Sequence, residues 1–138
     1  MARILAIDYG LKRTGIAVTD ELQIIASGLT TVSTKDLIPF LQDYIKKEEI
    51  ELFLIGEPKK LDNSPSESEV LIIPFMKKLE SVFPNIPIKR VDERFTSKLA
   101  FRAMIDGGLK KKKRKIKATI DMVSATIILQ DYLHSRKI

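Results

Sequence analysis

Acidic residues stand at three places in this chain from which side chains could gather around a metal ion. Asp8 follows the apolar run of residues 4–7, and the pair Asp92-Glu93 ends another predicted strand. Asp121 lies in a segment with helical spacing, where its neighbours on the same face are small or apolar. Mg²⁺ prefers oxygen ligands, usually one or two carboxylates with waters and phosphate oxygens. Together these positions predict a metal-dependent phosphodiester nuclease, in which divalent cations activate water and stabilise the leaving oxygen.

Each of these carboxylates also has a purely structural interpretation. Asp8 can accept amide hydrogen bonds from the glycine turn that follows it. Asp92 and Glu93 can form a surface salt bridge to Arg94 or Lys89, which taken alone would be the favoured interpretation. Adjacent strand residues point to opposite faces, so in the functional interpretation one of them faces the metal while the other pairs with a nearby base. Asp121 can form an ion pair with Lys117, worth a few tenths of a kcal/mol in a helix. A charge on a packed face is costly without a strong partner, and this favours the metal-ligand interpretation of Asp121.

Basic residues are concentrated in one segment of a chain whose net charge is +6. Seven of the eight residues from 110 to 117 are Lys or Arg. Such a block repels itself, which predicts a flexible loop that is either a solvated linker or a contact for the phosphate backbone. Charge alone does not choose between these two interpretations. The residues expected to contact phosphate are Lys110, Lys111, Lys112, Lys113 and Arg114.

The pattern of apolar residues predicts an α/β domain. Segments 3–9, 14–20 and 23–32 read as a β meander, and residues 51–56 and 86–94 as two further strands. Helical periodicity follows residue 36, where Ser33 and Asp36 resemble a capping box, and recurs at 70–83, 96–108 and 117–135. Pro74 either kinks its helix or marks the start. We expect a mixed five-stranded sheet with helices on both faces and the acidic strand ends along one edge.

Length and composition favour one ordinary globular domain over residues 1–138. The chain contains no cysteine, which excludes a disulfide scaffold and a thiolate metal site and is compatible with the cytoplasm. It contains no apolar stretch of about 18 residues, so we predict no membrane span. The single histidine, His134, is expected to be a surface residue.

Three motifs in this chain resemble the YqgF family, also called RuvX, a group of pre-16S rRNA nucleases and Holliday-junction-resolvase-like proteins. They are DYGLKRTG from Asp8, DERFTS from Asp92, and Ile120-Asp121 with the residues that follow. The match is in order and covers nearly the whole chain. The resemblance implies a ribonuclease H-like fold and Mg²⁺- or Mn²⁺-dependent cleavage, usually assigned to maturation of the 5′ end of 16S rRNA.

The resemblance also implies roles for particular residues. Asp8, Glu93 and Asp121 match the family's acidic positions as catalytic residues and metal ligands, and Lys12, Arg13 and Arg94 match its basic positions, which would suit phosphate contact. The chain departs from the family's usual Gly-Leu-Pro turn after the middle strand, because Glu57 replaces the leucine. Glu57 could be an extra ligand, a charge that repels substrate or a neutral change, so we leave it outside the predicted site.

Several functions and partners stay open at this point. RNA is the favoured substrate and structured DNA, such as a Holliday junction, the alternative; a pre-ribosomal particle is a further candidate partner. We expect a monomer or a weak homodimer. A non-catalytic RNA-binding module in ribosome assembly, in which the acidic residues serve only the structure, is a further alternative. A phosphotransferase of the actin type shares a similar Asp-x-Gly turn but needs two lobes, whereas 138 residues provide one.

Overall fold

The chain forms a five-stranded mixed sheet in the order β3-β2-β1-β4-β5. The computed structural model describes residues 2–57, 69–92 and 113–136, with backbone alone for 113–118. The strands are β1 (Arg3–Asp8), β2 (Arg13–Thr19), β3 (Ala26–Ser33), β4 (Ile50–Glu57) and β5 (Ile88–Asp92). Strands β1, β2 and β3 form the antiparallel meander, whereas β4 runs parallel to both β1 and β5. The predicted mixed sheet is therefore confirmed.

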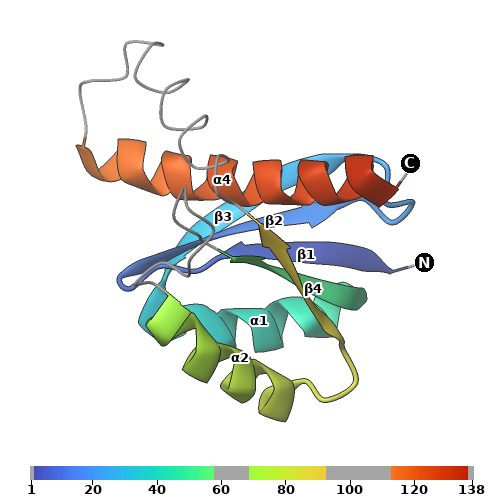
Figure 1. The fold of residues 1–138 in the computed structure, drawn as a ribbon, viewed down its shortest axis with the longest axis horizontal. Coiled ribbons are helices and arrows are strands. Elements are labelled where there is room, and N and C mark those ends of the chain that lie inside the picture. The colour runs from blue at the N-terminus through green and yellow to red at the C-terminus, as the bar shows by residue number, and fades with distance from the viewer. Residues whose placement is uncertain (1, 58–68, 93–112, 137–138) are drawn as a thin grey trace.

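Helices cover both faces of this sheet, as Figure 1 shows. The described helices are the short 3₁₀ turn η1 (Thr34–Asp36), α1 (Leu37–Lys47), α2 (Glu69–Val82) and α4 (Lys113–Arg136). Helix α4 lies along one face, and α1 and α2 lie together on the other. Helix α4 begins over the end of the sheet at which β1 finishes and runs back toward the end where the two termini lie.

Alternation along the strands divides the core into two clusters. In β1, Leu5 and Ile7 pack on the side of α1 and α2, whereas Ile4 and Ala6 pack on the side of α4. Successive side chains of a strand point to opposite faces, so each buried strand supplies both layers. This explains why β1 reads as a continuous apolar run, since helices cover both of its faces.

Small residues allow α4 to lie close against the sheet. A Cβ added to Gly15 of β2 would lie 1.9 Å from the carbonyl oxygen of Asp121, so the backbone of α4 occupies the space that a side chain would need. A Cβ on Gly28 of β3 would lie 2.7 Å from the Cγ of Met122. On the helix, Ser124 and Ala125 are buried in the same contact. The close packing expected from the small residues near Asp121 is confirmed.

The structure corrects two local predictions and excludes one of two alternatives for Pro74. Helix α4 begins at Lys113 rather than at Lys117, so the second half of the basic run is helical and not a loop. Ser33 makes no side-chain cap hydrogen bond, and the capping box is therefore wrong. Pro74 lies inside α2, which begins at Glu69, so it does not mark the start of that helix.

Two further expectations concern helices. The helix predicted at 96–108 lies outside the described residues. Within the described ranges, none of the helices has the length and apolarity needed to cross a membrane.

Candidate active site at the carboxyl edge of the sheet

Acidic residues end each of the three parallel strands on one edge of the sheet. These strands are β1, β4 and β5, which end at Asp8, Glu57 and Asp92. Glu57 pairs in register with Asp92, and Ile7 pairs with Ile55 one step before the edge. The predicted alignment of the acidic strand ends is confirmed, but the faces to which they belong differ.

Asp8 belongs to the face covered by α4. It follows Ile4 and Ala6 at alternate positions, and both of these pack in the α4 cluster. Its partner across the antiparallel ladder is Gly15, the residue whose missing side chain leaves room for the backbone of Asp121. Gly15 therefore contacts both positions, and the structure brings Asp8 and Asp121 to the same face of the sheet at the same edge.

Asp121 is held by an ion pair from β2. The Nε atom of Arg13 lies 2.9 Å from its Oδ2 atom and donates a hydrogen bond to it. Arg13 is at the start of β2, on the α4 face with Gly15. The side chain of Asp121 keeps 23% of its exposure and that of Arg13 keeps 40%, so water and small ions reach both. This contact spans 108 positions in the chain, and no sequence pattern predicted it.

Glu57 faces the opposite side of the sheet. Its neighbour Ile55 packs in the α1/α2 cluster, two positions earlier. The Oε2 atom of Glu57 lies 3.9 Å from Nη1 of Arg90, whose Nη2 is 2.7 Å from Oε1 of Glu69 on α2. Arg90 also donates a hydrogen bond to the carbonyl oxygen of Gly56 at 3.0 Å. Glu57 is therefore part of an ion-pair network that joins the end of β4 to α2, away from Asp121.

Asp92 shares the face of Glu57 rather than that of Asp8. In β5, Val91 packs in the α4 cluster, and the alternate residue Ile88 packs against the α1/α2 cluster. Alternation places Asp92 with Ile88 and Arg90, so Asp92 does not face α4. Its predicted companion Glu93 lies outside the described residues, as do Arg94, Lys110, Lys111 and Lys112.

The turn between β1 and β2 is fixed by hydrogen bonds to η1. Thr34 donates its backbone N–H to the carbonyl oxygen of Lys12 at 3.0 Å and its hydroxyl to that of Gly10 at 2.6 Å. A Cβ at Gly10 would lie 2.3 Å from the carbonyl oxygen of Arg13, so a side chain there would force the turn open. The exposed Lys12 side chain is thus carried by a firmly placed backbone beside Asp8.

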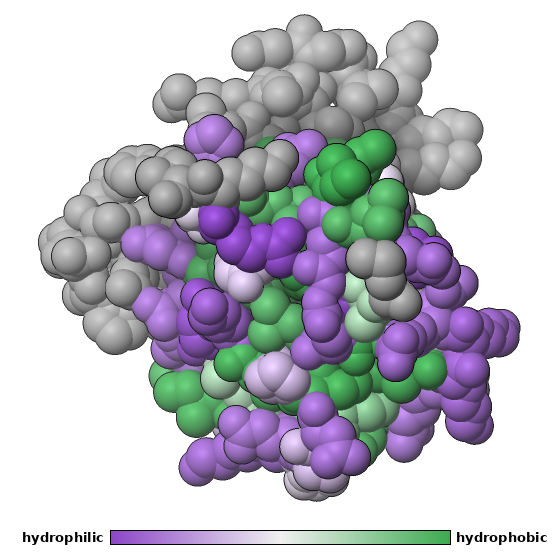
Figure 2. Space-filling view, turned by 90° about the vertical axis from the view of Figure 1, so that its right-hand side faces the viewer, coloured by the Kyte–Doolittle hydropathy of each residue, from purple (hydrophilic) through white to green (hydrophobic). Residues whose placement is uncertain are grey.

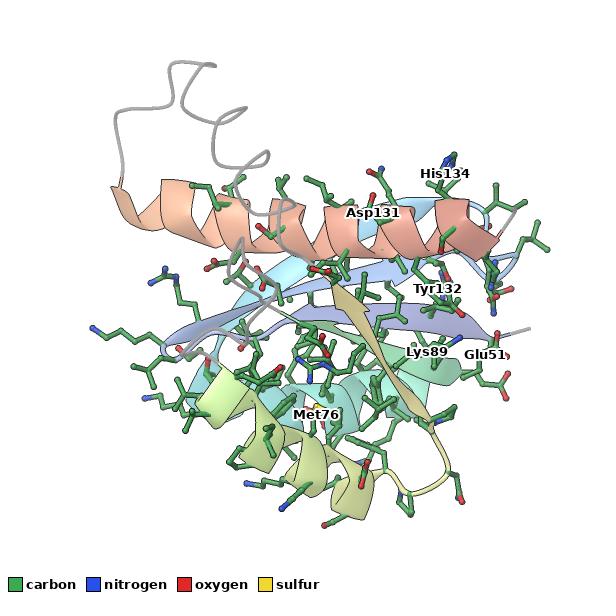
Figure 3. The ribbon with its side chains drawn as sticks, in the orientation of Figure 1. Glu51, Met76, Lys89, Asp131, Tyr132 and His134 are labelled. Carbon is green, nitrogen blue, oxygen red and sulfur yellow. The ribbon has the colours of Figure 1, made fainter. Side chains whose placement is uncertain are left out.

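The remaining predicted residues lie on α4. Lys113 and Arg114 form the first turn of the helix, which begins over the same edge. His134 lies near the other end of α4 and points away from the sheet, as does Asp131 (Figure 3). The surface assignment of His134 is confirmed.

The donor set at this edge suits a hard divalent cation. Asp8 and Asp121 supply carboxylate oxygens, and Mg²⁺ is usually held by one or two carboxylates together with waters and substrate phosphates. Within the described ranges, no group of three His, Cys, Asp or Glu side chains is close enough to hold a metal. Asp8 and Asp121 are both partly exposed on one face, so their chemistry would suit such an ion, with Glu93 expected to be the third ligand.

Comparison with known proteins assigns the family. The sequence model of RuvX, described as Holliday junction resolvase, matches residues 2–135. The chain belongs to the RuvX family. This confirms the resemblance drawn from its three motifs.

Curated relatives of this RuvX protein are similar over their whole length. A protein of Christiangramia forsetii is 64% identical over 97% of this chain and 99% of its own. A protein of Flavobacterium psychrophilum is 62% identical over all of both chains. Each is named "Putative pre-16S rRNA nuclease".

A solved structure supports the fold. RuvC of T. thermophilus, in complex with a Holliday junction substrate, aligns with a TM-score of 0.55 over 99% of this chain and 96% of its own. The sequences are 15% identical, so this likeness concerns the fold alone. The predicted ribonuclease H-like architecture is confirmed.

Proposed function

We propose that this RuvX-family chain is a metal-dependent endonuclease that hydrolyses phosphodiester bonds in the precursor of 16S rRNA. The observation that carries the proposal is the position of Asp8 and Asp121, which share one face and one edge of a ribonuclease H-like sheet. Names of relatives that are 62–64% identical over nearly their whole length favour ribosomal RNA as the substrate. A role in rRNA maturation would place the protein in the cytoplasm, with the pre-ribosomal particle as its partner.

Asp8, Asp121 and Glu93 would hold Mg²⁺ or Mn²⁺. When bound at such a site, a divalent cation activates water and stabilises the leaving oxygen. The chain's own residues prepare the site. The close fit of Gly15 against α4 sets the backbone of Asp121, and the hydrogen bond from Arg13 orients its carboxylate.

Basic residues around this edge would bind the substrate backbone. Arg13 is partly exposed beside Asp121, and a guanidinium can hold a carboxylate and a phosphate through separate N–H groups. Lys12 is exposed in the turn next to Asp8. Arg94 and the basic run of residues 110–114 complete the proposed set, in which Lys113 and Arg114 open α4.

The test is a cleavage assay with purified protein. Labelled 16S rRNA with a 5′ extension is incubated with and without Mn²⁺, beside Asp8→Asn and Asp121→Asn variants. We expect Mn²⁺-dependent cleavage by the wild type and its loss in both variants. Binding of the RNA without cleavage under all conditions would instead favour a non-catalytic assembly factor.

Resolution of Holliday junctions is the second candidate, because the matching family model carries that description. The same assay therefore includes a four-way DNA junction. Symmetric cuts in the junction with intact rRNA would replace the first proposal by the second.

A further inference from the structure

A groove opens beside the proposed catalytic edge, on the face of the sheet opposite to α4. It has a volume of about 480 Å³, within the range of about 300–1,000 Å³ that small-molecule sites occupy. Helices α1 and α2, η1 and the end of β1 contribute to it. The residues on which the argument rests are Tyr9, Thr34, Lys35, Ile38, Leu71 and Lys78.

The groove is tied to the catalytic edge through the backbone of β1. Tyr9 follows Asp8 directly, so their side chains leave the chain toward opposite faces. Asp8 belongs to the α4 face, whereas Tyr9 packs against the α1/α2 cluster and stacks on Phe75, with ring centroids 4.5 Å apart. Consecutive Cα atoms are about 3.8 Å apart. The Asp8 carboxylate and the groove therefore belong to the two opposite faces of the sheet at the same edge.

The chemistry of the lining is that of a nucleotide site. Ile38 and Leu71 offer apolar surface for a base, and Tyr9 adds an aromatic ring that stacks on the largely buried Phe75. The phenol hydroxyl of Tyr9 can donate and accept a hydrogen bond. Lys35 and Lys78 provide the two charged groups among the described lining residues, and both are positive.

The wall of the groove is also rigidly joined to the turn that carries Lys12. Thr34 lines the groove and donates hydrogen bonds to the carbonyl oxygens of Gly10 and Lys12. Its hydroxyl also lies 2.9 Å from that of Thr14, a buried residue of β2. A strand held at the edge would thus find the groove in a fixed position relative to the predicted phosphate contact at Lys12.

Two other surface features give less information about a ligand. Apolar side chains gather at the end of the molecule where the termini lie (Figure 2), where Leu22, Ile24 and Ile25 are exposed. At the same end, Lys89 lies beside Tyr132 (Figure 3), with Nζ 5.4 Å from the ring centroid. Nothing at either place indicates what would cover it.

We propose that the groove between α1 and α2 binds one unpaired nucleotide of the substrate strand, its base against Leu71 and Ile38 and its phosphates near Lys35 and Lys78. This inference rests on the proposed nuclease function, because that function brings a nucleic-acid strand to Asp8. An unpaired base enters a groove without the cost of breaking a base pair, so the site favours single-stranded RNA over a perfect duplex. Stacking of a base on an aromatic ring such as that of Tyr9 tolerates any sequence.

Binding is measured by fluorescence anisotropy with a short labelled single-stranded RNA and a blunt duplex of the same sequence, in EDTA so that no cleavage occurs. Leu71→Asp places a negative charge in the groove. Its control is Val70→Asp, the preceding residue of α2, which is 73% exposed and does not line the groove. At 0.15 M salt the Debye length is about 8 Å, so a distant charge acts weakly.

We expect Leu71→Asp to weaken single-strand binding by about fivefold or more, which corresponds to about 1 kcal/mol, because the carboxylate repels phosphate and removes apolar surface from the groove. Val70→Asp and the duplex should change little. A second pair compares Lys35→Ser/Lys78→Ser with Lys46→Ser/Lys47→Ser, which removes two exposed charges from the other end of α1. The groove pair should flatten the log–log salt slope on single strands by about 1.4, at about 0.7 per phosphate, and the control pair should not.

Two results separate the inference from the function on which it rests. Equal single-strand affinity in Leu71→Asp and wild type, or equal weakening of single strand and duplex, overturns the nucleotide site even if the wild type cleaves rRNA with Mn²⁺. If Leu71→Asp weakens single-strand binding but the wild type cleaves neither rRNA nor the DNA junction, the nucleotide site is supported and the proposed nuclease function is rejected.

Discussion

Asp8 and Asp121 differ from Glu57 in the face of the sheet to which each belongs, although Asp8 and Glu57 end adjacent parallel strands. Glu57 lies near Arg90 on the side of α2, and Asp121 is paired with Arg13 on the side of α4. The difference follows from alternation along the strands and not from residue type. It predicts that carboxylates at one edge respond differently to the same metal.

A Mn²⁺ titration tests this difference. Asp8→Asn and Asp121→Asn should each lower Mn²⁺ affinity by about tenfold or more, because even partners outside the ligand shell are typically worth about 10–100-fold. Glu57→Gln is the matched control, an isosteric change at the same edge, and should bind as the wild type does. Similar loss in all three variants would show that general negative charge, and not a defined site, attracts the ion.

Asp20 provides a test by pH at the opposite end of the sheet. Its Oδ1 atom accepts hydrogen bonds from the backbone N–H groups of Ile24 and Ile25, each at 2.8 Å. The bond from Ile25 is the largest cause of a pKa below the ordinary 3.8. A carboxyl with a depressed folded pKa contributes stability above its unfolded pKa and loses it as the pH falls through the folded one.

The Asp20 carboxyl carbon should therefore titrate below 3.8 in an NMR pH series, and the amide signals of Ile24 and Ile25 should move with it. Both amides should be protected from hydrogen exchange at pH 6 and lose that protection in Asp20→Ala, which has no side-chain acceptor. A midpoint at or above 3.8 would contradict the assigned hydrogen bonds.

At the scale of elements, the approach of α4 to the sheet decides the geometry of the candidate site. Gly15 meets the backbone of α4, at 1.9 Å from an added Cβ, whereas Gly28 meets the flexible side chain of Met122. Backbone cannot move aside without shifting the whole helix, but a methionine can adopt another rotamer. The two glycines therefore differ in what a methyl group would displace.

Gly15→Ala should destabilise the protein in urea by about 1–3 kcal/mol or more, the usual cost of overpacking a core. Gly28→Ala should cost clearly less. Both variants add one methyl group to a strand beneath the same helix, so each serves as a control for the other. Equal losses would mean that α4 adjusts as a unit.

Much of the arrangement of elements was predictable because it depends on local patterns. Apolar runs and alternation predicted the five described strands, and the parallel strands then required Asp8 and Glu57 to end at one edge. The predicted start of α4 was wrong. We expected the run of like charges to prevent a helix, but Lys and Arg are good helix formers. The roles of Asp8, Glu93 and Asp121 stay predictions.

Contacts between distant segments were beyond such patterns. The pair between Arg13 and Asp121 depends on how far α4 slides along the sheet, which the fit against Gly15 determines in three dimensions. The small residue at position 15 was visible in the sequence, but its partner was not. The face to which Glu57 belongs could not be predicted either, because it is defined by the ion pairs of Arg90 with Glu57 and with Glu69 of α2.

For the molecule as a whole, the two faces of the sheet carry different proposed binding sites at the same edge. The α4 face carries the proposed metal ligands, and the α1/α2 face carries the groove next to Tyr9. A strand of nucleic acid lying across the edge would contact both. The net charge of +6 adds long-range attraction for such a strand.

The basic run supplies the last prediction, because α4 begins at Lys113 over the same edge of the sheet. We expect the four lysines of residues 110–113 to bind substrate phosphates. Their replacement by serine should weaken RNA binding and flatten the log–log salt slope by roughly two to four, at about 0.7 per phosphate on single strands and about 0.9 on duplex. Sequence preference should not change, because phosphates carry no sequence information. The control replaces four exposed lysines elsewhere, Lys46, Lys47, Lys77 and Lys89, with serine, so that the two variants have the same net charge. Equal slopes in the two variants would mean that the run acts only through net charge.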